Sequence, residues 1–179
     1  MNHTLFDRIL TYNEITNIKD NSMSDQEFYT FSEYMRKEQE TLSPSAEDYM
    51  EMIYRLSKDQ GFTRVNDLAG ALNVQPPSVT KMIQKLSEMK LIKYEKYGVI
   101  IMEQEGKALG KALLYRHNLI EEFLKLLNIK EGLLTETEKI EHTINDETLL
   151  GIKALVEFFH DNPNVMNNWS QYRGINHID

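Results

Sequence analysis

The hydrophobic and polar positions of the first half of the chain follow two periods, one helical and one typical of strands. A helix is expected to begin at Pro44 and to end at Gly61. Two shorter amphipathic helices are expected over residues 65–72 and 78–89, separated by a tight connection and by Pro76 and Pro77, which are tolerated in a first helical turn. The apolar positions of the first helix are Tyr49, Met50, Ile53, Tyr54 and Leu56.

A strand-like pattern follows the two short helices. Residues 91–97 and 99–102 are rich in β-formers and flank Gly98, which predicts a hairpin. Two short helices joined by a three-residue turn form a helix-turn-helix. With the hairpin added, residues 44–104 are expected to form a winged helix-turn-helix DNA-binding domain.

The second half returns to helical spacing, so the predicted fold class is mainly α. Helices are expected over residues 106–127, 135–144 and 146–159, so residues 105–160 are expected to form a helical domain, to which the metal-binding and dimerisation roles are assigned below. The last of these helices has more apolar surface than one stripe requires, which a partner subunit explains. Burial inside a monomer is the alternative.

The two ends of the chain carry weaker patterns. Residues 161–179 have few apolar positions and are expected to form a flexible tail. Residues 1–43 form an N-terminal extension with some helical character, and one apolar stripe there is expected to dock on the winged helix or on a partner subunit. A flexible extension is the alternative. The stripe contains Phe28, Phe31, Tyr34 and Met35.

Composition narrows the class of protein. Hydrophobic residues make up 41% of the chain, there is no cysteine, and the net charge is −8. Thiolate metal sites and disulfides are therefore excluded, and no apolar run approaches the roughly 18–20 residues of a membrane span. Because the N-terminus lacks a secretion-signal pattern, a cytoplasmic location is expected.

The charge is distributed unevenly. Residues 58–97 carry seven Lys and Arg against four Asp and Glu, while the segments before and after are acidic. A local basic face is what phosphate binding needs, although charge is equally typical of a solvated surface helix.

Six acidic and histidine residues have the spacing of a metal site. Asp48 and Glu51 are three residues apart on one predicted helix, and Glu138, Glu141 and His142 share one face of another. Carboxylates and imidazoles on facing helices build metal centres in helical proteins. Taken singly, an acidic pair on a helix is more often solvent-facing, and a lone histidine is more often structural. His117, in the long helix between the two groups, completes the set.

Several segments together resemble the diphtheria-toxin-repressor family (DtxR/MntR), and within it the manganese transport regulator branch. The resemblance covers residues 43–160 in order and with compatible spacing. It is carried by the segments 45–54, 79–86, 94–97, 115–117 and 138–142.

The resemblance implies a winged-helix domain and a helical dimerisation domain, with metal bound between them. The iron-responsive branch has methionine and cysteine at two ligand positions where this chain has Asp48 and Glu138, which favours manganese. Two Mn²⁺ ions per subunit are implied, with Fe²⁺, Co²⁺, Zn²⁺ or Cd²⁺ able to bind in vitro. The six ligand positions fall on Asp48, Glu51, His117, Glu138, Glu141 and His142.

The sequence departs from the family at three places. Residues 1–42 are extra, and residues 102–106 replace the family's Thr/Ser-containing start of the long helix. The segment after Phe159 is too short for the third domain that some members carry.

The ligand charges suggest how metal acts. Four carboxylates repel one another without metal, and two divalent ions neutralise them. Metal binding is therefore expected to select the dimer arrangement in which two recognition helices match major grooves about 34 Å apart.

The predicted second helix and wing supply the DNA-binding candidates. Gln75, Ser78 and Lys81 lie near the start of the recognition helix, which usually meets base edges, and Pro77 suits a thymine methyl. The full set is Gln75, Pro77, Ser78, Thr80, Lys81, Gln84, Lys85, Lys93 and Lys96.

The remaining candidates are expected to hold phosphates. Thr80 and Lys85 do so from the helix, and Lys93 and Lys96 from the wing, with Tyr97 as a further candidate.

The function predicted from the sequence is a manganese-responsive, homodimeric repressor of metal-uptake genes. It binds a double-stranded DNA operator and needs neither a membrane nor an organic cofactor. The alternatives are a winged-helix regulator that responds to iron or to a small organic ligand, and a di-metal enzyme or metal store. The sequence indicates neither a nucleophile nor a substrate cleft, as an enzyme would need, so no catalytic residue is assigned.

Overall fold

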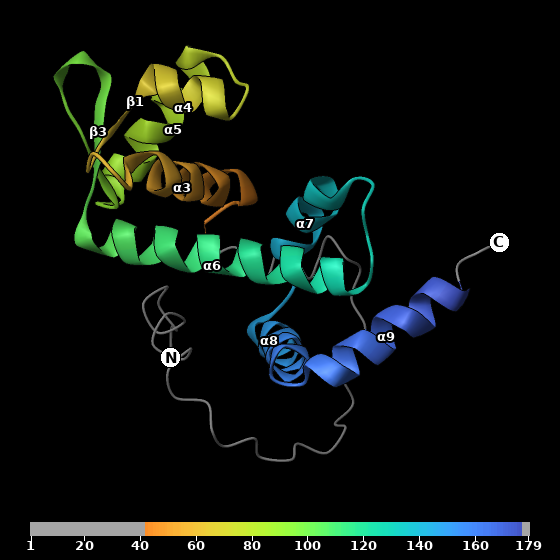
Figure 1. The fold of residues 1–179 in the computed structure, drawn as a ribbon. Helices are drawn as coiled ribbons and strands as arrows, with labels where there is room; N and C mark the ends of the chain where they lie inside the picture. Colours follow the sequence, from red (N-terminus) through yellow and green to blue (C-terminus); the bar gives the residue numbers. More distant parts are fainter. Residues whose placement is uncertain (1–41, 177–179) are drawn as a thin grey trace, which may run out of the picture. The chain divides into compact units, whose positions relative to one another are not determined.

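The computed structural model describes residues 42–176, which form two compact units that divide within one long helix, between Leu113 and Leu114. The predicted stripe at residues 28–35 lies outside the described residues. In chain order the elements are α3 (Pro44–Ser57), β1 (Thr63–Arg64), α4 (Val65–Ala71), α5 (Pro76–Glu88), β2 (Ile92–Tyr94), the 3₁₀ helix η1 (Lys96–Gly98), β3 (Val99–Met102), α6 (Gln104–Leu126), α7 (Leu133–Glu141), α8 (Asp146–Asp161) and α9 (Pro163–Asn176) (Figure 1).

The helix-turn-helix of the first unit consists of α4 and α5. Asn73 adopts a left-handed backbone (φ 53°) in the turn, and the Val74 amide donates to the Ala69 carbonyl. Pro76 stands in the first turn of α5, where a missing N–H costs nothing. The two helices pack with α3 on a common apolar core. Its fully buried side chains include Met50, Ile53, Leu68, Val79, Ile83 and Leu86.

The predicted hairpin is confirmed and belongs to a three-stranded antiparallel sheet with the order β1-β3-β2. Ile92 pairs with Met102, and Ile100 pairs with Tyr94 on one side and with Thr63 on the other. The hairpin projects beside α4 and α5 as the wing (Figure 1). The strand β1 was not predicted, because two residues are too short to show a period.

The beginning of α6 belongs to the first unit. Leu109 and Leu113 are buried in the winged-helix core. At Gly106 the helix backbone approaches so closely that a Cβ atom would lie 2.0 Å from the Leu91 carbonyl oxygen. The first turns of α6 therefore pack with the winged helix.

The second unit contains the rest of α6 with α7, α8 and α9. Asn145 caps α8 by accepting a hydrogen bond from the Thr148 amide at 2.8 Å. Two apolar residues of α8, Leu155 and Phe158, remain 42% and 48% exposed. Within the part of the chain that the structure describes, the apolar surface of this helix is therefore not fully covered. The unit's core is formed by Leu119, Ile120, Leu124, Leu126, Leu149 and Val156.

The expectation of a loose tail is corrected for residues 163–176, which form α9. The Trp169 indole Nε1 donates to the Leu126 carbonyl at 2.9 Å, and its ring lies 6.2 Å from the Phe159 ring. One aromatic residue thus satisfies a carbonyl at the end of α6 and fastens α9 to the unit. Among the described helices, none is both long and apolar enough to cross a bilayer.

Candidate metal centre and DNA-binding surface

Helix α7 presents three of the predicted ligands together. Glu138 and Glu141 lie one turn apart, and His142 follows as the C-cap. Each offers one carboxylate oxygen or imidazole nitrogen, and these three atoms lie within 4.8 Å of one another. The (i, i+3, i+4) spacing produces this because such positions share one helix face.

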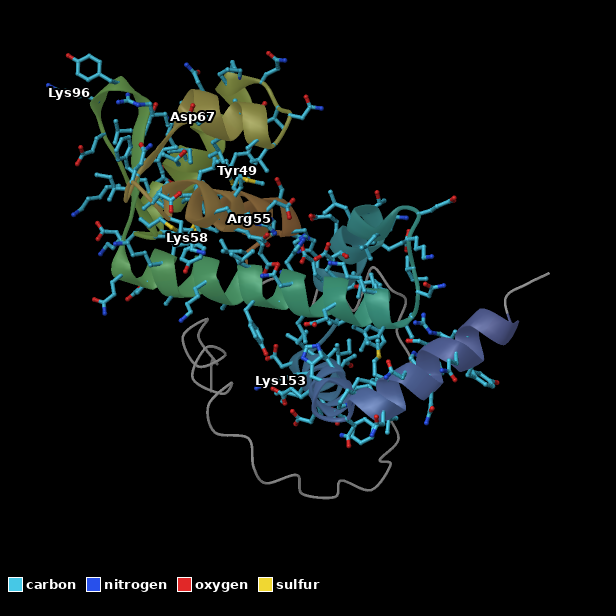
Figure 2. All side chains as sticks on the ribbon, in the orientation of Figure 1. Tyr49, Arg55, Lys58, Asp67, Lys96 and Lys153 are labelled. Atoms are coloured by element: carbon cyan, nitrogen blue, oxygen red, sulfur yellow. The ribbon has the colours of Figure 1, made fainter. Side chains whose placement is uncertain are left out.

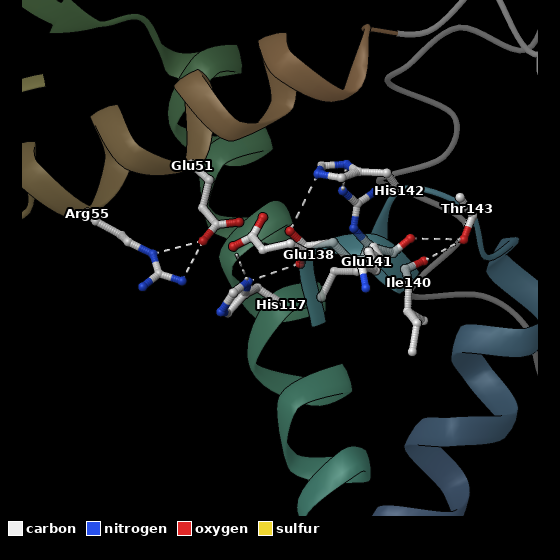
Figure 3. A network of polar contacts seen from close by, with 10 residues as sticks. Glu51, Arg55, His117, Glu138, Ile140, Glu141, His142 and Thr143 are labelled. Atoms are coloured by element: carbon white, nitrogen blue, oxygen red, sulfur yellow. Dashed lines mark hydrogen bonds and ion pairs between the residues drawn. The ribbon is translucent and has the colours of Figure 1, made fainter. Parts of the chain in front are cut away.

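His117 on α6 joins the three. Its Nδ1 lies 3.1 Å from Oε2 of Glu141 and 3.7 Å from Oε1 of Glu138. The other carboxylate oxygen of Glu141 lies 3.6 Å from Nε2 of His142 (Figure 3). Glu141 is therefore the centre of the cluster, with each of its oxygens facing a different imidazole.

The four side chains fit a divalent metal. Two donors that each lie about 2.0–2.2 Å from one ion, at a right angle, are roughly 3 Å apart, which is close to the observed separation of the His117 and Glu141 atoms. Glu141 is 2% exposed and His117 5% exposed, so water compensates little of the buried negative charge. Hard oxygen and imidazole donors without sulfur suit manganese and similar ions.

The remaining two predicted ligands lie on α3, in the first unit. Asp48 is half-buried, and Glu51 is buried and bonded to Arg55, whose Nε donates to Glu51 Oε1 at 2.8 Å. Between them along the chain, burial raises the pKa of the Tyr49 phenol above its ordinary value. The structure thus gathers four of the six residues in the second unit and places the other pair on one helix of the first.

Two arginines beside predicted ligands were missed by the sequence reasoning. Arg55 lies four residues after Glu51, and this spacing was a signal that could have found it. Arg116 Nη2 lies 3.4 Å from Nδ1 of His142 on another helix, a contact that no local spacing reveals.

The start of α5 has the properties of a DNA-reading helix. Its first turn contains no acidic residue, so the positive end of the helix dipole is unopposed. The polar side chains expected to read DNA lie on its outer side. The exposed candidates are Gln75, Pro77, Ser78, Lys81, Gln84 and Lys85.

Three further DNA candidates have different surroundings. The Thr80 hydroxyl donates to the Pro76 carbonyl at 3.1 Å, so its proton is not directed at a phosphate. Lys93 Nζ lies 3.1 Å from Glu103 Oε1, while Lys96 is exposed on the wing (Figure 2). Next to Lys96, Tyr97 is 91% exposed and has a left-handed backbone (φ 62°).

The wing tip is held by a residue that the sequence reasoning did not select. Arg64 Nη1 donates to the Tyr97 carbonyl at 3.2 Å and ties the tip to the start of α4. A single arginine before a short helix is a common pattern, so the sequence pattern alone does not identify Arg64 as important.

A winged helix-turn-helix followed by a helical unit with clustered carboxylates and imidazoles defines the class of metal-dependent DNA-binding regulators. The sequence matches the family described as "Iron dependent repressor, N-terminal DNA binding domain" over residues 41–100. Residues 103–170 match "Iron dependent repressor, metal binding and dimerisation domain". The chain belongs to this family of iron dependent repressors, and it is a transcription regulator, not an enzyme.

Curated relatives agree with this assignment. The chain is 43% identical over 120 residues to the HTH-type transcriptional regulator MntR of Bacillus velezensis, covering 66% of this chain and 84% of the relative. It is 42% identical over 120 residues to MntR of Bacillus subtilis, with the same shares covered.

Solved structures share the fold. The manganese regulator SloR matches with a TM-score of 0.57 and 28% identity over 65% of this chain. The metal-dependent transcriptional regulator MtsR matches with a TM-score of 0.59 and 28% identity over the same share. The matched region spans 55% of each of these two solved chains.

Proposed function

We propose that this protein is a manganese-responsive repressor of metal-uptake genes that acts in the cytoplasm. The observation that carries the proposal is the cluster of His117, Glu138, Glu141 and His142, which offers only oxygen and nitrogen donors around a buried carboxylate. The family assignment supplies the DNA-binding and dimerisation functions that such a cluster would control.

The donor chemistry supports manganese over iron, although the family's description names iron. Mn²⁺ lies at the low end of the divalent affinity series, so a site that selects Mn²⁺ must do so through its geometry and its hard donors. The solved relative SloR is described as a manganese regulator, which agrees with this donor set. An iron-responsive regulator is the second candidate, favoured by the family's description.

Asp48 and Glu51 are proposed to complete the ligand set, as the family resemblance implies. Both lie on α3 and are three residues apart, so they share one face of that helix. The six residues then hold two Mn²⁺ ions per subunit, and the ions neutralise four carboxylates. No organic cofactor is required.

The switch follows from this charge balance. Without metal the carboxylates repel, which disfavours any arrangement that brings them together. Metal reverses the sign of that interaction, and the homodimer then holds its two α5 helices at the spacing of an operator. A change from mostly inactive to mostly active protein needs about 5.5 kcal/mol of differential binding, which two multidentate ions can provide.

The test is operator binding by the full chain, measured by fluorescence anisotropy on DNA from upstream of a manganese importer. We expect tight binding with Mn²⁺, weaker binding with Fe²⁺ and little binding with a chelator. A random sequence of equal length controls for nonspecific attraction. Equal binding with and without metal would refute the proposal, and a response to Fe²⁺ alone would favour the iron-responsive candidate.

A further inference from the structure

One predicted metal ligand, Glu51, already forms an ion pair with a neighbouring arginine side chain. Both Nε and Nη2 of Arg55 approach the same oxygen of Glu51, Oε1, and the Nε contact is 2.8 Å long (Figure 3). The two residues lie one turn apart on α3, within one unit. Because the Glu51 side chain is 11% exposed and the Arg55 side chain 36%, the pair is partly shielded from water.

We propose that Arg55 sets the metal concentration to which this regulator responds, by competing with the ion for Glu51. The inference rests on the proposed function, in that Glu51 is taken to be a ligand. Two N–H groups occupy the lone pairs of Oε1, so an ion that uses this oxygen must displace them.

Charge repulsion acts in the same direction. A guanidinium is permanently charged at any pH that the protein meets, so it repels a divalent ion beside it. With four carboxylates in the site, Arg55 already neutralises part of their charge before metal arrives. The four carboxylates and Arg55 together carry −3, so after one divalent ion has bound only one negative charge is left for the second ion. Arg55 therefore weakens metal binding, and the later ion is affected most.

The test is direct titration of the metal-free full chain with Mn²⁺, followed by electron paramagnetic resonance of the free ion and without DNA. In Arg55→Gln we expect the dissociation constant to fall about fivefold, the size expected for a partly exposed charged pair. Arg55→Lys keeps the charge but loses the two-pronged contact, so an intermediate value is expected. Lys58→Gln is the matched control, because it removes one positive charge from an exposed position one turn further along (Figure 2).

Thermal melting gives a second readout. Metal-free Arg55→Gln should melt at a lower temperature than the unaltered protein, because Glu51 has lost its counter-charge. The rise in melting temperature on adding Mn²⁺ should be larger. If Arg55→Gln binds Mn²⁺ with the affinity of Lys58→Gln, or more weakly, the competition is refuted; weaker binding would show that Arg55 orients the ligand.

Glu51→Gln separates this inference from the proposed function. Strongly weakened Mn²⁺ binding shows that Glu51 is a ligand. Adding Arg55→Gln in that background should then strengthen Mn²⁺ binding by less than it does in the unaltered protein, because the competition for Glu51 is gone and only the charge repulsion is left to relieve. Mn²⁺ binding unchanged by Glu51→Gln would remove Glu51 from the ligand set and the inference with it. A ligand role for Glu51 with no effect of Arg55 would overturn the inference alone.

Discussion

At the residue scale, the metal centre depends most on Glu141. Its two oxygens face two imidazoles, one 3.1 Å and the other 3.6 Å away, and the residue is 2% exposed. A carboxylate so buried is unfavourable unless a proton, a cation or a metal compensates it. A divalent ion shared by these donors would compensate the buried carboxylate, so the cluster is arranged to gain from binding one.

The first prediction is that Glu141→Gln abolishes the metal response. The amide keeps the size of the side chain but removes the charge and one acceptor, so the dissociation constant for Mn²⁺ should rise about a hundredfold or more. Isothermal titration calorimetry on metal-free protein measures it. Glu136→Gln is the matched control, since Glu136 lies on the same helix and pairs with Lys139 at 2.7 Å on the surface. Similar affinities for the two variants would rule out Glu141 as a ligand.

The sequence predicted the composition of this cluster better than its contacts. Glu138, Glu141 and His142 share one helix face by spacing alone, and local spacing is visible in a sequence. The approach of His117 to Glu141 depends on how α6 and α7 pack, which no local pattern encodes. The contact of Arg116 with His142 was missed for the same reason.

At the element scale, periodicity predicted the helices that bury one clear stripe and missed those that do not. Helix α5 has Val79, Ile83 and Leu86 at helical spacing, all fully buried, and its position was predicted to within two residues at its start. Helix α9 has no such stripe. It is held by Trp169, whose indole bonds to a carbonyl 43 residues earlier, a long-range contact that periodicity cannot reveal.

The second prediction concerns the packing of α6 on the winged helix. Gly106→Ala should lower the free energy of unfolding by about 3 kcal/mol, because the new methyl group meets the Leu91 carbonyl, which already accepts from the Glu103 amide at 3.0 Å. Urea unfolding measures the change. In Gly70→Ala the new methyl meets nothing within 4 Å, and stability should rise by about 0.5–1 kcal/mol. A Gly106→Ala protein as stable as the unaltered one would show that α6 is not packed so closely.

The third prediction separates the roles of α5 and the wing. Lys81→Ala should lose about 1–3 kcal/mol of discrimination between operator and random DNA, because Lys81 is expected to reach base edges. Lys96→Ala should weaken binding to both sequences equally and reduce the salt slope by about one, because Lys96 is expected to contact a phosphate. Anisotropy titrations at several salt concentrations test both. If the two variants behave alike, the division between base-reading and phosphate-holding residues is wrong.

At the scale of the whole molecule, the chain is acidic yet carries a basic DNA-binding region. The net charge is −8, while the exposed lysines of α5 and the wing lie within the basic segment 58–97. Acidic charge elsewhere disfavours random DNA and supplies metal ligands, so affinity for an operator has to come from two properly spaced recognition helices. On the proposed mechanism, the dimer is therefore as necessary as the metal.

The last prediction is that the apolar surface of α8 forms the dimer contact. Leu155 and Phe158 are about half exposed, on the domain that the family description associates with dimerisation. Leu155→Glu places a charge in this surface and should raise the dimer dissociation constant at least about a hundredfold, as measured by sedimentation velocity. Glu157→Gln, on the neighbouring exposed position, should leave the dimer intact.

The Leu155→Glu monomer should still bind Mn²⁺ through α6 and α7 but should lose most of its operator affinity, because one recognition helix cannot span two half-sites. A variant that stays dimeric would place the contact elsewhere on the second unit.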